Sequence, residues 1–319
     1  MKIVILGAGA LGSLIGAHLA RAGEEVTLLA RGQRAKLIRE KGVTVTGLAN
    51  FNVPVRVAET PDEVQEADLL LVAVKTYDTE DALKTLDHFK VGCALSVQNG
   101  VLKNEQLTRY FGKEKTLGAT AAIGGEVIPT GDVRMTFNGV LYLGELPEGA
   151  SKRVQTLAAA LSRSGLNVEA SNQIQSLEWG KYIAFISFMP LSVLTRLEVY
   201  KIFKDPNLAY LTAMLARETA QLAEKLNIPI YDFGVIPAKT FSSSSTEEAM
   251  ASIRKSGEML EARGAAVKAS ALQDLERGRR LEVEEILGYA VRKGKELDLR
   301  LPTVETCYKL LNGINRYLS

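Results

Sequence analysis

The sequence predicts an α/β protein in which a Rossmann-type doubly wound sheet domain is followed by a mostly α-helical domain. Over the first half of the chain, short apolar runs alternate with segments of helical periodicity. A glycine-rich turn joins the first apolar run to the first helical segment, and strand signals nearly disappear after residue 169. Alternating strands and helices are typical of a parallel sheet covered by helices on both faces.

Length and composition fit two globular domains. The chain has 319 residues, of which 46% are hydrophobic and 24% are charged, and this length suggests two domains. We assign residues 1–170 to the sheet domain and residues 171–319 to the helical domain. The 39 basic and 37 acidic residues give a net charge of +2, which argues against nucleic-acid binding.

Cysteine, histidine and hydropathy patterns exclude further classes of protein. Cys93 and Cys307 lie far apart and show no zinc-binding spacing, and two histidines cannot build a histidine-rich metal site, so we expect no metal. A reduced, cytoplasmic protein is the expectation, and one long-range disulfide is the alternative. No run reaches the roughly 18 apolar residues of a membrane span. The N-terminal apolar run is interrupted by glycines, which indicates a buried strand rather than a signal peptide.

The expected elements of the first half are mostly buried strands. Residues 2–6 are a continuous apolar strand, and residues 11–22 form a helix that ends at Gly23. Asn138-Gly139 predicts a hairpin turn between two strands. The further strands are expected at residues 25–30, 67–74, 94–97, 116–122, 132–137 and 140–143, and a further helix at residues 79–86.

The second half carries helical patterns, which prolines separate. These patterns cover residues 151–164, 176–195, 207–226, 247–261, 284–297 and 303–317.

The glycine-rich turn reads Gly7-Ala8-Gly9-Ala10-Leu11-Gly12, a GxGxxG pattern between a buried strand and a helix. In that context Gly7 permits the tight turn, Gly9 lets a pyrophosphate approach the backbone, and Gly12 lets helix and strand pack closely. The pyrophosphate would meet free N–H groups at the positive end of the helix. The pattern predicts a dinucleotide site.

The end of the second strand indicates which dinucleotide binds. NAD sites usually carry an acidic residue there for the ribose 2′-hydroxyl, but this chain has Arg31 and Arg34 instead. A guanidinium can hold a 2′-phosphate through two hydrogen bonds. We therefore predict NADPH, with Arg31 as the main contact and Arg34 as a second contact.

A nicotinamide-dependent reductase also needs a proton donor. His18 lies on the first helix and His88 in a surface-like stretch, so neither suits that role. Lys181 lies in a mostly apolar helix, where burial could lower its pKa. The pattern alone also fits a surface lysine whose stem covers apolar neighbours.

Several motifs in matching order resemble the ketopantoate reductase (2-dehydropantoate 2-reductase) family. The resemblance covers most of the chain. It rests on the N-terminal glycine-rich segment, Val72-Ala-Val-Lys75-Thr, Ser96-Val-Gln-Asn99-Gly, Glu178-Trp-Gly-Lys181, Ser270-Ala-Leu-Gln-Asp274 and the segment 281–288.

The resemblance implies a role for each matching residue. Lys181 would be the general acid that protonates the reduced carbonyl oxygen, and Glu282 would orient it and contact the substrate. Asn99 would lie near the nicotinamide and the substrate, and Lys75 near the cofactor. Ser270 would bind the substrate carboxylate. One continuous helix would separate Ser270 from Glu282 by about 18 Å, so both can reach one ligand only if the chain breaks near Gly278.

One departure concerns the substrate. The best-known members carry asparagines where this chain has Phe185, Met189 and, further on, Val199. Phe and Met cannot bind a hydroxyl or carboxylate, so these positions weaken the assignment of the substrate more than that of the cofactor.

The resemblance implies an NADPH-dependent oxidoreductase that reduces a 2-oxo acid to a 2-hydroxy acid. The first candidate reaction converts 2-dehydropantoate to pantoate, toward pantothenate and coenzyme A. Alternatives are a reductase of the same fold for a bulkier or less polar oxo acid or an imine, and an NADPH-binding sensor without turnover. A homodimer fits the apolar helical half, although core burial explains the same pattern.

Overall fold

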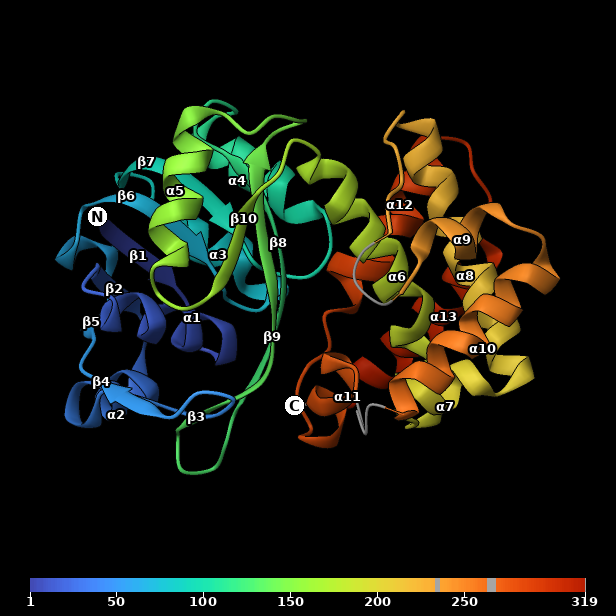
Figure 1. Ribbon diagram of the computed structural model, residues 1–319, viewed down its shortest axis with the longest axis horizontal. Helices are drawn as coiled ribbons and strands as arrows, with labels where there is room; N and C mark the ends of the chain where they lie inside the picture. Colours follow the sequence, from blue (N-terminus) through green and yellow to red (C-terminus); the bar gives the residue numbers. More distant parts are fainter. Residues whose placement is uncertain (233–235, 263–267, 319) are drawn as a thin grey trace. The chain divides into compact units, whose positions relative to one another are not determined.

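The computed structural model describes residues 1–232, 236–262 and 268–318. The chain divides into two compact units, Met1–Asn99 with Lys103–Gln175, and Gly100–Leu102 with Ser176–Ser319. Figure 1 shows the sheet unit in blue to green and the helical unit in yellow-green to red. The predicted fold class, a Rossmann-type sheet domain followed by a helical domain, is confirmed.

The main sheet of the first unit has five parallel strands in the order β5-β2-β1-β6-β7. The central strand β1 (Lys2–Leu6) is buried from Ile3 onward because strands flank it and helices cover it. It pairs with β2 (Glu25–Leu29) on one side and β6 (Glu66–Val72) on the other. The chain moves outward from β1 in one direction and returns on the other side, so a topological switch point lies between β1 and β6.

Helices and short connections complete this layer. The spacing of Leu11, Leu14, Ile15 and Leu19 predicts one buried face of the first helix. Leu14, Ile15 and Leu19 are fully buried, whereas Leu11 is partly exposed, and Gly23 follows the helix end with φ +87°. The elements are α1 (Ala10–Arg21), α2 (Gly32–Lys41), β5 (Arg56–Ala58), η1 (Pro61–Glu63), η2 (Thr76–Asp78), α3 (Thr79–Lys84), β7 (Lys90–Ser96) and α4 (Leu102–Phe111).

A second sheet, in the order β10-β9-β3-β4, contains the long antiparallel pair of β8 and β9 (Figure 1). The predicted hairpin at Asn138-Gly139 is wrong, because β9 runs through both residues. A Cβ atom on Gly139 would lie 2.5 Å from the Ala122 oxygen, so this glycine permits a close backbone approach beside a bulge. The bounds are β3 (Val43–Gly47), β4 (Phe51–Val53), β8 (Leu117–Val127), β9 (Val133–Glu145), α5 (Lys152–Ser162) and β10 (Asn167–Ala170).

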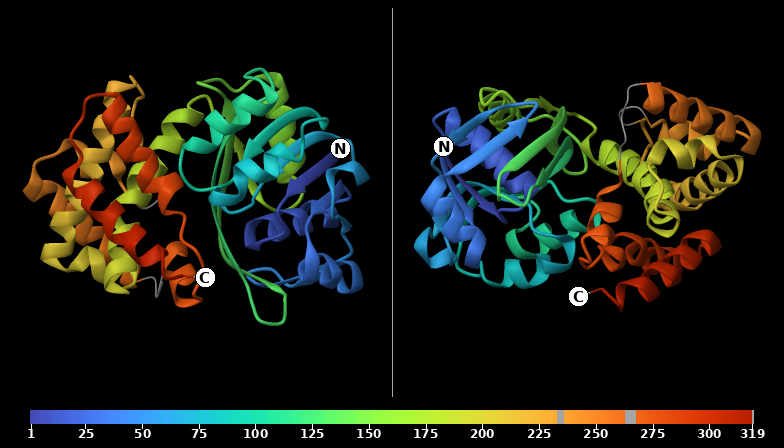
Figure 2. Two further views of the ribbon diagram at one scale, coloured as in Figure 1. Left: turned by 180° about the vertical axis from the view of Figure 1, so that it is seen from behind. Right: turned by 90° about the horizontal axis from the view of Figure 1, so that it is seen from below.

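Helices build the second unit around a chain of aromatic rings. Successive ring centroids are 5.7, 6.0 and 6.1 Å apart from Phe185 through Phe188 and Phe203 to Phe241. Figure 2 shows α10 beside α8, against which it packs. The elements are α6 (Ile174–Thr195), α7 (Val199–Lys204), α8 (Pro206–Lys225), α9 (Ala238–Ser243), α10 (Thr246–Ala262), α11 (Ser270–Glu276), the π-helical turn η3 (Glu284–Gly288), α12 (Tyr289–Glu296) and α13 (Pro302–Asn315).

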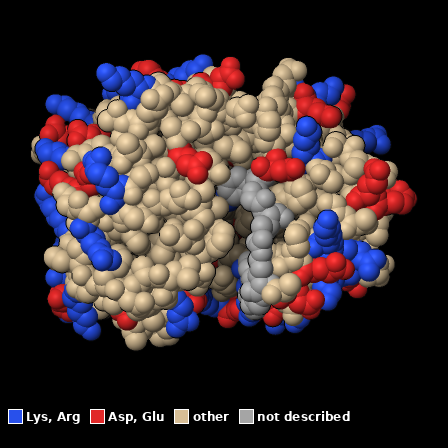
Figure 3. All heavy atoms as spheres, in the orientation of Figure 1, with Lys and Arg blue, Asp and Glu red and all other residues tan. Residues whose placement is uncertain are grey.

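Surface charge, the two cysteines and helix hydropathy bear on nucleic-acid binding, disulfide formation and membrane insertion. Figure 3 shows acidic and basic side chains interspersed on the face in view, with no extended field of basic residues there for a phosphate backbone. Cys93 and Cys307 are free, and burial raises the pKa of each thiol to about 11. Within the described part of the chain, no helix has the length and apolar character needed to cross a bilayer.

Candidate functional site

The glycine-rich turn follows β1 at the switch point of the main sheet. Gly7 has φ +107°, a conformation that side chains rarely adopt, and a Cβ atom on Gly12 would lie 2.0 Å from the Gly7 carbonyl oxygen. A Cβ atom on Gly9 would meet nothing within 4 Å. Two glycines are therefore required by the fold itself, whereas Gly9 keeps an open approach to the backbone.

The same turn leads into the N-terminus of α1. Gly9 is the N-cap, and its lack of a side chain leaves the first-turn N–H groups without a side-chain cap. Ala8 is buried, whereas Ala10 and Leu11 are partly exposed. An open glycine backbone at the positive end of a helix fits the pyrophosphate of a dinucleotide, so Gly7 to Gly12 are the residues that would hold it.

Arg31 and Arg34 have different surroundings. Arg31 follows β2 as the N-cap of α2, and its side chain is exposed. Arg34 is half-buried and donates hydrogen bonds to three acceptors of the protein itself, the carbonyl oxygens of Ala8 and Gly131 and the hydroxyl of Ser13. The contact of Arg34 with the 2′-phosphate stays a prediction. Because three of its N–H groups bind the protein itself whereas Arg31 is exposed, Arg31 is the main candidate for that contact.

Lys75 and Asn99 follow the carboxyl ends of two neighbouring strands, β6 and β7. Gln98, which sequence reasoning did not single out, joins these two loops. Its Nε2 donates to the Val74 carbonyl oxygen at 2.8 Å and to the Thr79 hydroxyl at 2.7 Å. The Ala73 N–H donates to the Leu6 carbonyl oxygen at 2.9 Å, which brings the loop of Lys75 beside the glycine-rich turn. Ligands of open α/β sheets bind at such strand ends.

A buried lysine binds the backbone of the loop that carries Asn99. Lys103 is 3% exposed, and its ammonium group donates to the carbonyl oxygens of Ser96, Gln98 and Ala119 at 3.1, 3.2 and 2.5 Å. The buried ammonium group therefore fixes the backbone at the carboxyl end of β7, next to Asn99. No local sequence signal distinguishes this lysine from the exposed ones.

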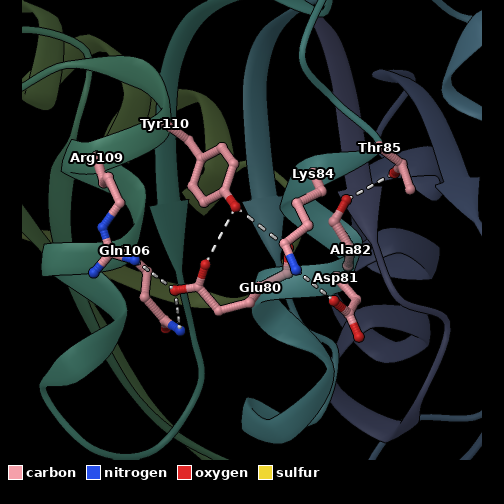
Figure 4. A network of polar contacts seen from close by, with 8 residues as sticks. All are labelled: Glu80, Asp81, Ala82, Lys84, Thr85, Gln106, Arg109 and Tyr110. Carbon is pink, nitrogen blue, oxygen red and sulfur yellow. Dashed lines mark hydrogen bonds and ion pairs between the residues drawn. The ribbon is translucent and has the colours of Figure 1, made fainter.

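A surface network holds the helices that follow these loops. Figure 4 shows Glu80 of α3 between three side chains of α4. Its carboxylate accepts hydrogen bonds from Gln106 at 3.1 Å, Arg109 at 3.0 Å and Tyr110 at 3.2 Å. The network joins α3 to α4 and thereby restrains the loops that carry Lys75 and Asn99.

The two histidines match the roles expected of them. His18 is buried, its Nδ1 donates to the Ser164 carbonyl oxygen at 3.1 Å, and burial lowers its pKa. His88 is exposed. Neither lies among the loop residues described above.

In the second unit, Lys181 lies on an accessible stripe of the buried helix α6. Between residues 176 and 193, the partly exposed side chains are Leu177, Lys181 and Phe185, and all others are buried. Residues four apart share one face of a helix, so the lysine has an apolar neighbour on each side. This placement gives the ammonium access to a ligand within apolar surroundings.

The helix of Lys181 is fastened to the segment that follows Glu282. The buried Tyr182 hydroxyl donates to the Ile286 carbonyl oxygen at 2.7 Å, and its ring packs edge-on against Tyr289 with centroids 6.2 Å apart. On the other side of Glu282, the Leu281 N–H donates to Asn315 Oδ1 at 2.7 Å. Glu282 is therefore held between two anchored neighbours, and sequence reasoning found neither anchor.

Ser270 and Glu282 lie on separate segments, as the argument from length requires. Ser270 is the first residue of α11, which ends at Glu276, and Gly278 has φ +66°. Residues 277–282 are not helical, so the break near Gly278 is confirmed.

Glu285 is a further carboxylate that sequence reasoning missed. Its Oε2 is buried without a hydrogen-bond partner among the residues that the structure describes, and burial raises its pKa. It lies in the π-helical turn η3, and such turns occur frequently at functional sites.

The three positions where the family often has asparagine differ in exposure. Phe185 is partly exposed, whereas Met189 and Val199 are 2% and 1% exposed. Of the three, only Phe185 therefore combines access with a place on the stripe of Lys181.

Comparisons with known proteins cover both units. The family described as "Ketopantoate reductase PanE/ApbA" matches residues 3–148, and "Ketopantoate reductase PanE/ApbA C terminal" matches residues 173–315. A 2-dehydropantoate 2-reductase of Archaeoglobus fulgidus is 32% identical over 98% of this chain and 97% of its own length. One of Pyrococcus abyssi is 30% identical over 98% of this chain and 97% of its own length.

Solved structures agree with this assignment. The structure of a PanE/ApbA family ketopantoate reductase from Ralstonia eutropha has a TM-score of 0.84 and 27% identity, with 99% of each chain covered. The chain belongs to the ketopantoate reductase PanE/ApbA family and is an NAD(P)-dependent oxidoreductase that acts on oxo acids.

Proposed function

We propose that this chain uses NADPH to reduce a 2-oxo acid to a 2-hydroxy acid, and that 2-dehydropantoate, which yields pantoate, is the first candidate substrate. The observation that carries the proposal is the accessible Lys181 on α6, beside the segment of Glu282 to which Tyr182 ties that helix. Relatives at 32% and 30% identity that are named 2-dehydropantoate 2-reductase support the substrate.

The sheet unit supplies the residues proposed to bind the cofactor. In the sheet unit, Gly7 to Gly12 hold the pyrophosphate, Arg31 binds the 2′-phosphate, and Lys75 and Asn99 lie near the nicotinamide. When bound, the reduced nicotinamide supplies a hydride to the C2 carbonyl carbon of the oxo acid.

The helical unit, residues 171–319 in our assignment, binds the substrate and supplies the proton. Lys181 Nζ donates a proton to the carbonyl oxygen as it gains charge, and Glu282 orients the ammonium group. Ser270 binds the substrate carboxylate, and Asn99 contributes a further polar contact.

Initial rates with 2-dehydropantoate and a panel of other 2-oxo acids, each with NADPH and NADH, test the proposal. Because a guanidinium–phosphate pair contributes about 1.5–3 kcal/mol, kcat/KM with NADPH should exceed that with NADH by roughly tenfold or more. Equal rates with both cofactors would contradict the role of Arg31. Tight NADPH binding without turnover of any oxo acid would favour the sensor.

A second candidate substrate is a bulkier or less polar oxo acid. Phe185 favours it, because the ring stands one helical turn from Lys181 on the accessible stripe. The fold itself accommodates such ligands: a D-mandelate dehydrogenase structure with NADH and anilino(oxo)acetate has a TM-score of 0.84 at 20% identity.

The variant Phe185→Asn separates the two substrates. If the ring contacts the substrate, an amide there should raise kcat/KM for 2-dehydropantoate relative to an aromatic 2-oxo acid by roughly tenfold or more, since even one methylene group in a hydrophobic pocket is worth about 1–3 kcal/mol. Phe137→Asn is the matched control, because Phe137 is 58% exposed on β9 of the other unit. An unchanged ratio of kcat/KM in the Phe185 variant would show that this ring does not select the substrate.

The cytoplasmic location and the homodimer stay predictions. A ketopantoate reductase of Staphylococcus aureus that shares the fold, with a TM-score of 0.76 and 16% identity, is described as dimeric. Light scattering of the purified chain would establish its assembly.

A further inference from the structure

We propose that Arg34 is a positioning residue that holds the glycine-rich turn in the shape that binds the pyrophosphate of either NADPH or NADH. The inference rests on the proposed function, in which this turn binds a dinucleotide. It assigns Arg34 to a different task from Arg31, although the two residues lie three positions apart at the start of α2.

Arg34 contacts acceptors on three different segments. Its Nε donates to the Ala8 carbonyl oxygen at 3.0 Å, its Nη2 to the Ser13 hydroxyl at 2.8 Å, and its Nη1 to the Gly131 carbonyl oxygen. Ala8 lies within the turn, Ser13 in the first turns of α1, and Gly131 between β8 and β9. One guanidinium therefore joins three segments that are distant in sequence.

Arg34 and Ser13 together orient the peptide between Ala8 and Gly9. The Ser13 hydroxyl also donates to the Ala8 carbonyl oxygen, at 2.9 Å, so two donors fix the direction of that carbonyl. In a planar trans peptide the carbonyl and the following N–H point in opposite directions. Fixing the Ala8 oxygen toward Arg34 therefore turns the Gly9 N–H to the opposite side, which sets the direction of a phosphate-binding donor.

The arrangement of these acceptors requires an arginine. The hairpin tip, which is the connection between β8 and β9 at residues 128–132, packs closely on α2. A Cβ atom on Gly131 would lie only 2.1 Å from Leu37 Cδ2. A planar guanidinium presents several N–H groups in a fixed fork, whereas a lysine offers one flexible point charge. Only the fork can reach the turn, the helix and the hairpin tip at once.

The inference predicts a signature that separates the two arginines. Arg34 acts on the part of the site that contacts the pyrophosphate, which both cofactors share, so losing it should weaken both to the same extent. Arg31 would contact only the 2′-phosphate, so losing it should weaken NADPH alone. A purely structural role of Arg34 would lower the melting temperature without a matched loss of affinity for both cofactors.

The test is a titration of the full-length chain with NADPH and with NADH, followed by nicotinamide fluorescence. The variants are Arg34→Met, Arg34→Lys, Ser13→Ala and Arg31→Met. Arg39→Met is the matched control, because Arg39 is exposed on the same helix and pairs with Glu59. Circular dichroism reports whether each variant folds.

We expect Arg34→Met to raise both dissociation constants by roughly tenfold or more, at an unchanged ratio, since the lost bonds are charge-assisted. Arg34→Lys should recover only part of this loss, and Ser13→Ala should raise both constants by a smaller factor. Arg31→Met should raise the constant for NADPH alone, and Arg39→Met should change neither.

Three results would overturn the inference. Unchanged affinities in a folded Arg34→Met variant would exclude positioning, and a loss confined to NADPH would return Arg34 to the 2′-phosphate. If Arg34→Met does not fold, unchanged affinities in Ser13→Ala decide against the inference. Absence of binding by the unsubstituted chain would contradict the proposed function itself.

Discussion

Replacing Lys181 by alanine is expected to lower kcat for the best 2-oxo acid by about 100- to 10,000-fold, the usual contribution of a general acid. The dissociation constant for NADPH should stay within about twofold, because the residues proposed to hold the dinucleotide belong to the sheet unit. Turnover kinetics and a fluorescence titration measure the two quantities. Lys181 is partly exposed, so the substitution leaves no buried cavity and should not prevent folding.

Two further variants separate proton donation from simple attraction of the substrate. Lys181→Arg keeps the positive charge, but a guanidinium does not give up its proton at neutral pH, so its kcat should stay low. Lys201→Ala is the control, since Lys201 is an exposed lysine of the same unit that pairs with Glu198. Full turnover in the Lys181→Ala variant would show that another group donates the proton.

The variant Gly12→Ala is expected to lose stability, whereas the variant Gly9→Ala is expected to lose NADPH affinity. At Gly12 the new Cβ atom would lie 2.0 Å from a backbone oxygen, so we expect a loss of roughly 1–3 kcal/mol or more in the free energy of unfolding. At Gly9 nothing lies within 4 Å and φ is −71°, so the chain should fold normally. The methyl group would, however, occupy the path of the pyrophosphate, and NADPH affinity should fall by tenfold or more.

Thermal melts and NADPH titrations of both variants check this contrast. Gly313→Ala is the matched control, because that glycine lies in α13 with nothing within 4 Å of a Cβ atom. It should leave NADPH affinity unchanged and stabilise the helix slightly. Normal NADPH affinity in a folded Gly9→Ala variant would place the dinucleotide elsewhere.

The fold could be predicted where one physical signal dominates. Buried elements need apolar residues at the spacing of their secondary structure. The continuous apolar run of β1 and the helical spacing of Leu14, Ile15 and Leu19 therefore predict these two elements correctly. The predicted hairpin at Asn138-Gly139 is wrong because the same dipeptide suits a tight turn and a bulge, and only the partner strand distinguishes them. The strands β4 and β5 have three residues each, too few for a periodic pattern.

The site could be predicted only as far as local motifs reach. The glycine-rich turn and Arg31 are adjacent to recognisable elements. The apolar helix indicates Lys181 as one candidate, and the resemblance to the family adds its role and those of Glu282, Asn99, Lys75 and Ser270. Arg34, Gln98 and Lys103 act on backbone oxygens of distant segments. Such contacts leave no spacing in the sequence, because backbone acceptors are the same for every residue type.

A crystal structure of the chain with NADPH and an unreactive analogue of the 2-oxo acid would show the proposed contacts with cofactor and substrate at once. We expect the pyrophosphate against the N–H groups at the start of α1, the Arg31 guanidinium on the 2′-phosphate, and Lys181 Nζ about 2.6–3.2 Å from the oxygen of the analogue that stands for the carbonyl. A dinucleotide bound away from residues 7–12, or Lys181 directed away from the analogue, would contradict the account.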